Sequence, residues 1–98
     1  MGGLAERYED QVVAGPGGVM TDEVGVVTGD LTVVTEADDD QAHVARVRVQ
    51  YTGAEEWYTL TGSPIPLAGR SAGQVHQAVL RAAATGAEGG VSADHLRS

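Results

Sequence analysis

One short motif in the chain carries the residues of a serine nucleophile. Residues 69–73 read GRSAG, which matches the G-x-S-x-G turn of α/β-hydrolases, and Asp94 and His95 follow in the right order for a triad. That chemistry needs a large, mainly parallel sheet with a buried strand before Ser71. A chain of 98 residues does not supply such a sheet, and two prolines stand where the strand would be. We therefore expect Ser71 to cap a helix, with a minimal serine hydrolase as the alternative.

A run of aspartates at residues 38–40 carries the oxygen ligands that divalent cations prefer. An EF-hand loop beginning at Asp38 needs glycine at its sixth position and glutamate at its twelfth, but His43 and Val49 stand there. Asp38, Asp40 and His43 could hold a weakly bound ion, and a solvated turn is the favoured interpretation. The chain has no lysine or cysteine, and its histidines have no partner at ligand spacing. The sequence therefore predicts neither a metal site nor a cofactor.

The polar face of a predicted β-hairpin is the candidate site for a protein partner. Residues 44–61 read VARVRVQYTGAEEWYTLT, in which two alternating segments flank a Thr-Gly-Ala-Glu turn. Pairing outward from the turn places Arg48 opposite Thr59 and Val49 opposite Tyr58. Trp and Arg are enriched at interface hot spots. The candidate partner-binding residues on the polar face are Arg46, Arg48, Gln50, Trp57 and Thr59.

The same face also has explanations within the chain. Arg48 lies diagonal to Trp57, so its guanidinium can stack on the indole and cover it. Acidic residues from the first half of the chain can pair with the arginines. Alternatively, a helix packs on this side and Trp57 belongs to the core. The sequence leaves these alternatives open.

Charge is unevenly distributed along the chain. Residues 1–43 hold ten acids and one arginine, a net charge of −9, whereas residues 44–98 hold four acids and five arginines, a net charge of +1, in agreement with the formal −8. Because phosphate backbones repel so acidic a chain, we expect no nucleic-acid partner. No segment approaches the roughly 20 apolar residues of a membrane span, and the acidic start is unlike a signal peptide. We expect a cytoplasmic protein that does not enter a membrane.

The first half of the chain predicts a helix followed by strands. Leu4, Tyr8 and Val12 recur at helical spacing, so residues 4–13 are predicted to form a short helix, which the GPGG sequence ends. Residues 31–35 are β-branched and predict a strand. Residues 19–30 are ambiguous, with one short strand conceivable around Val26.

The clearest helix lies after the hairpin. Residues 62–69 contain two prolines and predict an extended connector. Ser71 and Gln74 form an S-x-x-Q capping box, and Gly86 supplies the stop. The predicted apolar stripe of this helix is Val75, Ala78, Val79 and Ala82.

Together these elements predict an α+β domain over residues 1–86. It has a three-stranded antiparallel sheet, or a four-stranded one if a strand forms near Val26, with an N-terminal and a C-terminal helix packed on one face in the order α-(β)-β-β-β-α. Residues 87–98 are small and polar, and we expect them to form a flexible tail.

The function that this sequence favours is a small, non-catalytic interaction domain. It would bind a protein partner, a second copy of itself included, through the polar face of the hairpin or through an edge strand. A second hypothesis is an acidic decoy or antitoxin-like inhibitor, whose first half occupies a basic surface of the partner. The minimal serine hydrolase using Ser71 is the alternative in the enzyme class.

Overall fold

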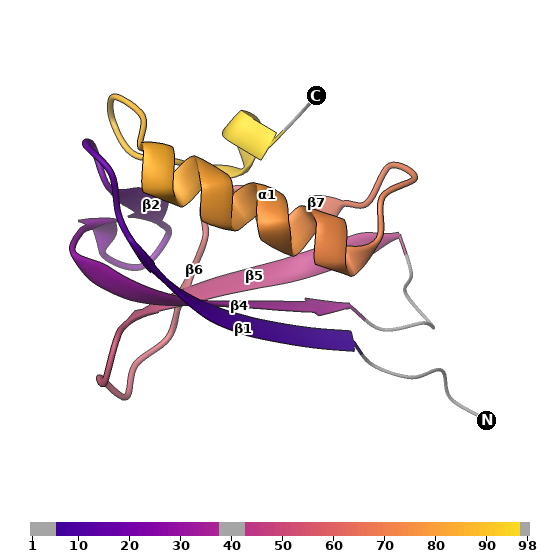
Figure 1. The fold of residues 1–98 in the computed structure, drawn as a ribbon, viewed down its shortest axis with the longest axis horizontal. Helices are drawn as coiled ribbons and strands as arrows, with labels where there is room; N and C mark the ends of the chain where they lie inside the picture. Colours follow the sequence, from indigo (N-terminus) through magenta and orange to yellow (C-terminus); the bar gives the residue numbers. More distant parts are fainter. Residues whose placement is uncertain (1–5, 38–42, 97–98) are drawn as a thin grey trace.

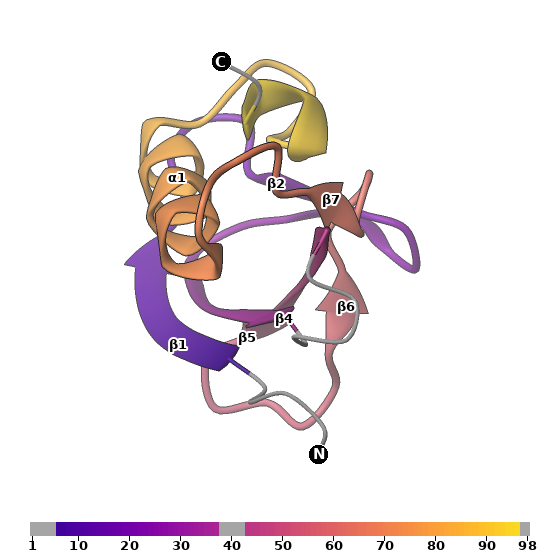
Figure 2. The ribbon, with the colours of Figure 1, turned by 90° about the vertical axis from the view of Figure 1, so that its right-hand side faces the viewer.

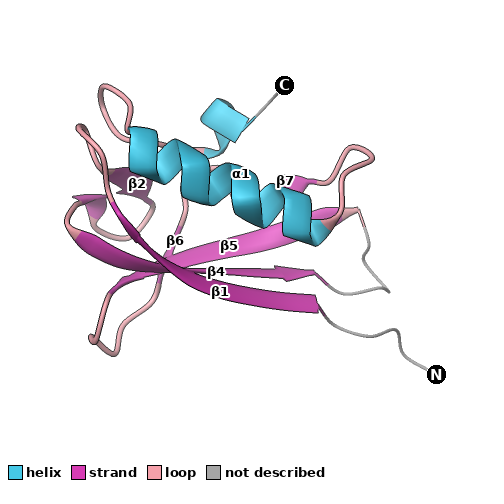
Figure 3. Cartoon of the chain, viewed as in Figure 1, coloured by secondary structure: helices cyan, strands magenta, loops and turns pink. Residues whose placement is uncertain are grey.

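The computed structural model describes residues 6–37 and 43–96, within which one α-helix packs against a curled antiparallel sheet (Figure 1). The predicted fold, two helices on a three- or four-stranded sheet, is therefore wrong. Strands outnumber helices in the described chain, as Figure 3 shows. In chain order its elements are β1 (Glu6–Val13), β2 (Val19–Thr21), β3 (Gly25–Val27), β4 (Asp30–Ala37), β5 (Val44–Tyr51), β6 (Tyr58–Thr59), β7 (Ile65–Pro66), α1 (Ala72–Thr85) and the 3₁₀ helix η2 (Ala93–Leu96).

The segment predicted as the first helix is strand β1. It pairs antiparallel with β4 over all eight residues, beginning with Glu6 opposite Ala37. Tyr8 and Val12 lie four residues apart, and residues at that spacing share one face in a strand as well as in a helix, so their pattern fits both. An isolated helix of about ten residues is marginal in water, whereas pairing with β4 satisfies this backbone along its length.

The strands form one curled layer around the core. The sheet order is β1-β4-β5-β6, and β7 pairs with the first residues of β5. The hairpin of β2 and β3, in the region that the sequence left ambiguous, continues the curl beside β6. It is joined there by a hydrogen bond from the N–H of Asp22 to the carbonyl of Thr59 (3.0 Å). Figure 2 looks along the curl and shows α1 lying across its open side.

The predicted register of the hairpin is confirmed where β5 and β6 pair. Arg48 lies opposite Thr59 and Val49 opposite Tyr58. Because neighbouring residues of a strand face opposite sides, the first pair lies on the face away from α1 and the second on the face toward it. The face away from α1 is called the outer face below.

The turn of the hairpin and the segment after β6 differ from the prediction. The tight turn closes one residue earlier, with a hydrogen bond from the N–H of Ala54 to the carbonyl of Tyr51 (2.8 Å). Gly53 has a φ of +88°, which glycine adopts readily. The predicted connector contains the short strand β7, in which Pro66 lies opposite Val44. A proline is tolerated there because β7 lies at the edge of the sheet.

Helix α1 begins and ends as predicted, but its buried face is rotated. The Ser71 hydroxyl accepts from the N–H of Gln74 (3.1 Å), and the Gln74 side-chain oxygen accepts from the N–H of Ser71 (2.8 Å), which completes the capping box. Gly86 is the C-cap. His76 is buried whereas Ala78 is only half-buried. The buried residues of the helix are Ala72, Val75, His76, Val79 and Ala83.

The segment after α1 is part of the packed structure. Val91 and Leu96 are 1% and 5% exposed, and the N–H of Val91 donates to the carbonyl of Gly18 (2.8 Å). The compact unit therefore includes residues 87–96, which belong to the segment 87–98 that was predicted to be a flexible tail. None of the described helices is long and apolar enough to cross a membrane.

Candidate functional site

The predicted partner-binding residues lie together on the outer face of the sheet. Arg46, Arg48 and Gln50 alternate along β5, and Thr59 stands beside Arg48 on β6. The guanidinium carbon of Arg48 lies 6.0 Å from the centroid of the Trp57 ring, as the diagonal pairing implied. The structure thus gathers the five residues, and Trp57 is half-buried on this face.

Acidic residues from the first half of the chain cover much of the positive charge on this face. The Arg48 guanidinium pairs with the Glu36 carboxylate at 2.6 Å. The other oxygen of Glu36 lies 3.7 Å from Arg7, which also pairs with Glu9 at 2.9 Å. Exposed pairs of this kind contribute about 0–1 kcal/mol each to stability. They nevertheless neutralise Arg48 within the chain.

Gln50 and Thr59 are also committed to contacts within the protein. The Gln50 amide donates to the carbonyl of Ala54 (2.8 Å) and holds the turn. The Glu23 carboxylate accepts from the N–H of Thr59 (2.7 Å) and from its hydroxyl (2.8 Å). These two bonds lower the pKa of Glu23 below its usual range, because they stabilise the charged form. A hollow of about 250 Å³ remains on this face; Arg46, Arg48, Ser63 and Pro64 are among its lining residues.

The residues of the hydrolase motif are engaged elsewhere. The Ser71 hydroxyl accepts the cap hydrogen bond described above. The Nδ1 atom of His95 accepts from the N–H of Ser92 (3.0 Å) within η2 and the turn before it. No hydrogen bond found in the described part of the chain joins Ser71 to His95. The motif thus forms the start of a helix, as predicted from the sequence.

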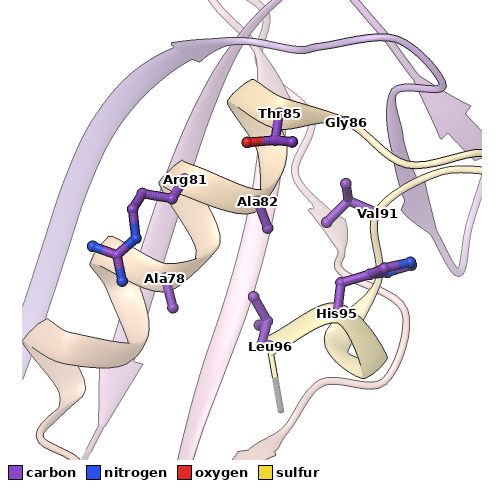
Figure 4. A pocket seen from close by; sticks show the side chains of 8 residues that line it. All are labelled: Ala78, Arg81, Ala82, Thr85, Gly86, Val91, His95 and Leu96. Atoms are coloured by element: carbon purple, nitrogen blue, oxygen red, sulfur yellow. The ribbon is translucent and has the colours of Figure 1, made fainter. Parts of the chain in front are cut away.

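A groove of about 390 Å³ separates α1 from η2 (Figure 4). Arg81 and His95 stand at its two sides, and in Figure 4 their side chains point away from each other. The groove thus lacks the convergent polar groups that orient a bound small molecule. Small and apolar side chains make up much of its lining: Ala78, Ala82, Val91 and Leu96.

The described ranges, residues 6–37 and 43–96, contain no group of three His, Asp or Glu side chains that could hold a metal ion. Of the weak-ion hypothesis, His43 is exposed, whereas Asp38 and Asp40 lie outside the described residues. The remaining histidines make protein contacts through their ring nitrogens.

A buried hydrogen-bond chain that the sequence did not indicate joins α1 to the sheet. The His76 ring is 1% exposed; its Nδ1 atom lies 2.8 Å from the hydroxyl of Thr35 on β4, and its Nε2 atom lies 2.8 Å from the carboxylate of Asp10 on β1. Tyr8 stacks on the ring, with centroids 5.7 Å apart. A carboxylate only accepts, so in the neutral ring Nε2 carries the hydrogen and Nδ1 accepts from Thr35.

This chain has the residue types of a catalytic triad in an arrangement that suits structure instead. The hydroxyl belongs to Thr35, which is fully buried, so a substrate does not reach it. The exposed end is the carboxylate of Asp10, with 55% of its side-chain surface accessible. We therefore interpret Asp10, His76 and Thr35 as a tie that holds β1 and β4 to the helix.

The tie holds β1, which is an edge strand. The pattern of its hydrogen bonds with β4 shows which of its backbone groups point away from the sheet. The N–H of Ala14 donates to the carbonyl of Gly29 (2.9 Å), and these residues continue the β1–β4 register. Hydrogen-bonded pairs alternate along an antiparallel ladder, so the even-numbered residues of β1 bond to β4. The N–H and C=O groups that point away from the sheet belong to Arg7, Glu9, Gln11 and Val13.

The hydrogen bonds between β4 and β5 agree with this assignment of inward and outward groups. The N–H of Thr52 donates to the carbonyl of Asp30 (3.0 Å), which directs the even-numbered residues of β4 toward β5 and the odd-numbered ones toward β1. β1 is the last strand of the sheet, and no described strand lies along its outer edge. Its residues are exposed except for Val12, which is half-buried.

Comparisons of the chain with protein-family models, with curated proteins and with solved structures gave no match. The functional interpretation therefore depends on the geometry of the described residues alone.

Proposed function

We propose that this protein is a small, non-catalytic protein-interaction domain that binds an extended segment of its partner along the edge of β1. The observation that carries the proposal is the unpaired edge itself. Four N–H and four C=O groups point outward along a strand of eight residues, seven of them exposed, which is the arrangement that strand addition uses. Main-chain hydrogen bonds would supply affinity, and the alternating side chains would supply selectivity.

The tie between β1 and α1 favours this role. Asp10 bonds to His76, and Tyr8 stacks on the same ring, so β1 is fixed at its middle as well as along β4. An edge strand that is already ordered loses little conformational freedom when a second strand pairs with it, which improves affinity.

The polar face of the hairpin is a second contact surface under this proposal. Arg48 and Thr59 are already engaged by acidic side chains of the protein, so this face offers fewer unpaired groups than the β1 edge. Trp57 remains partly accessible beside them. A partner strand paired with β1 would extend the outer face of the sheet. The rest of the partner could then contact the hairpin on that face.

Proline at Gln11 tests the proposed edge. The substitution Gln11→Pro removes an outward N–H group but no β1–β4 hydrogen bond, and it changes no charge. The preceding residue is already in an extended conformation, which proline requires of its neighbour. Proteins captured from lysate by the wild type should be lost with Gln11→Pro and retained with the control Gln11→Thr, both variants having the wild-type circular dichroism spectrum.

Two results would count against the β1 edge. Capture that is insensitive to Gln11→Pro would show that the partner binds elsewhere. If Trp57→Ala and Arg48→Ala abolish that capture, the hairpin face is the contact surface instead. Unchanged capture by all of these variants would exclude both surfaces.

A further inference from the structure

The edge of β1 presents carboxylates on both faces of the sheet. Side chains alternate along the strand, so Glu9 lies on the outer face, whereas Glu6 and Asp10 lie on the face toward α1. The one basic residue of the strand, Arg7, already pairs with Glu9 and approaches Glu36. The strand therefore has a net charge of −2 over its described length.

A strand added at this edge would place its side chains beside these carboxylates. Directly opposite residues of paired strands have their Cβ atoms about 4.5–5.5 Å apart, within reach of a lysine or arginine. Like charges that lie directly opposite destabilise the pairing. A second copy of β1 would bring a second strand of net charge −2 beside the first, so net charge disfavours a homodimer through this edge.

Resting on the proposed function, we propose that the partner segment at β1 is an extended, basic peptide with lysine or arginine opposite Glu9 and Asp10. One oxygen of the Asp10 carboxylate bonds to His76, and the Asp10 side chain is half exposed. The carboxylate can therefore also pair with a basic side chain of the partner. The acidic decoy hypothesis predicted a basic partner from net charge alone. The edge of β1 further specifies where the basic segment binds, that it is extended, and which of its residues lie opposite Glu9 and Asp10.

Synthetic peptides test whether the edge of β1 prefers a basic segment or binds any extended segment. The probes are three acetylated and amidated eight-residue peptides of valine and threonine. Their two central positions carry Lys-Lys, Gln-Gln or Glu-Glu, and in full overlap these positions fall opposite Glu9 and Asp10 in either strand direction. Titration at about 20 mM salt, where screening is weak, should give a Kd for the Lys peptide roughly 2- to 30-fold lower than for the Gln peptide. The Glu peptide should bind weakest.

Two variants assign the preference to its cause. Glu9→Gln should reduce the advantage of the Lys peptide over the Gln peptide, because it removes one of the two facing charges. Gln11→Pro should weaken all three peptides alike, because it removes a backbone donor. Asp10 is left unchanged in these variants because it also holds His76.

Amide hydrogen exchange measured by NMR identifies the binding mode. With the Lys peptide at saturation, exchange should slow at the N–H groups of Arg7, Glu9, Gln11 and Val13. Equal affinity of the Lys and Gln peptides, with that protection pattern, would overturn the basic class and leave the proposed function intact. No protection by any peptide would overturn both, and the charges of β1 would then serve only to discourage edge pairing. A concentration-dependent dimer of the protein alone, protected at the same amides, would assign the edge to a second copy.

Discussion

The strongest prediction concerns the hydroxyl of Thr35 within the buried tie. Thr35→Val keeps the shape of the side chain but leaves Nδ1 of His76 without a donor, at a site where both residues are at most 1% exposed. A buried polar atom left without a partner costs about 1–3 kcal/mol. For a domain of this size, that corresponds to a fall of roughly 5–20 °C in Tm.

Asp10 should matter less to stability than Thr35, although it bonds to the same ring. Asp10→Ala removes the acceptor for Nε2, but the carboxylate side chain is 55% exposed, so water can take its place. We expect a loss of about 0.5–1.5 kcal/mol, the typical net contribution of one hydrogen bond. The larger loss is expected for Thr35→Val because Thr35 is buried. If the charge of the hydrogen-bonding group decided the loss, Asp10→Ala would have the larger effect.

Urea unfolding followed by circular dichroism and by the fluorescence of Trp57 measures these differences. Thr32→Val is the matched control, because it makes the same chemical change on β4. Thr32 bonds to Thr52, which keeps a second bond to Asp30, so no group would be orphaned. The reasoning is refuted if Thr35→Val costs no more than Thr32→Val, or if Asp10→Ala costs more than Thr35→Val.

Three further predictions address the start of the helix, the segment after it and the Glu23 contact. Ser71→Ala should lower the free energy of unfolding by about 1 kcal/mol, because it removes the N-cap acceptor, and urea unfolding measures this loss. Leu96→Ala should cost about 2–5 kcal/mol in the same assay, whereas no change would mean that residues 87–96 do not contribute to the core. The bonds from Thr59 lower the pKa of Glu23, so their stabilisation is present above about pH 4.3 and is lost as the carboxylate protonates. The stability difference between wild type and Glu23→Gln should therefore shrink as pH falls from 6 to 3, and a constant difference would contradict the assignment.

The elements that could be predicted from the sequence carry their signals locally. Ser71 and Gln74 lie three residues apart and bond to each other, so the start of α1 was visible without knowledge of the rest of the chain. The pairing of Arg48 with Thr59 followed in the same way from a turn and two alternating segments. Contacts between distant segments gave no such signal: Glu23 meets Thr59 across 36 residues.

The candidate edge is the clearest case of a feature that sequence patterns alone do not indicate. A strand is recognised by apolar residues at every second position, and on the inward face of β1 these positions are Tyr8, Asp10 and Val12. The charged residue in the middle interrupts the pattern. Without Asp10, the apolar residues left on this face are Tyr8 and Val12, and their spacing of four residues also fits a helix.

One polar contact accounts for two of the errors in the predicted fold. Asp10 interrupts the inward face of β1, so this segment taken alone suggested a helix. His76 interrupts the apolar stripe of α1, so that segment taken alone suggested a different buried face. The two side chains lie 66 residues apart in sequence and satisfy each other at 2.8 Å. A polar residue is tolerated beside the core when its partner is also there, and single-sequence periodicity cannot register that pairing. The contact that concealed β1 is thus the contact that orders it, and the proposed strand addition at its edge depends on that order.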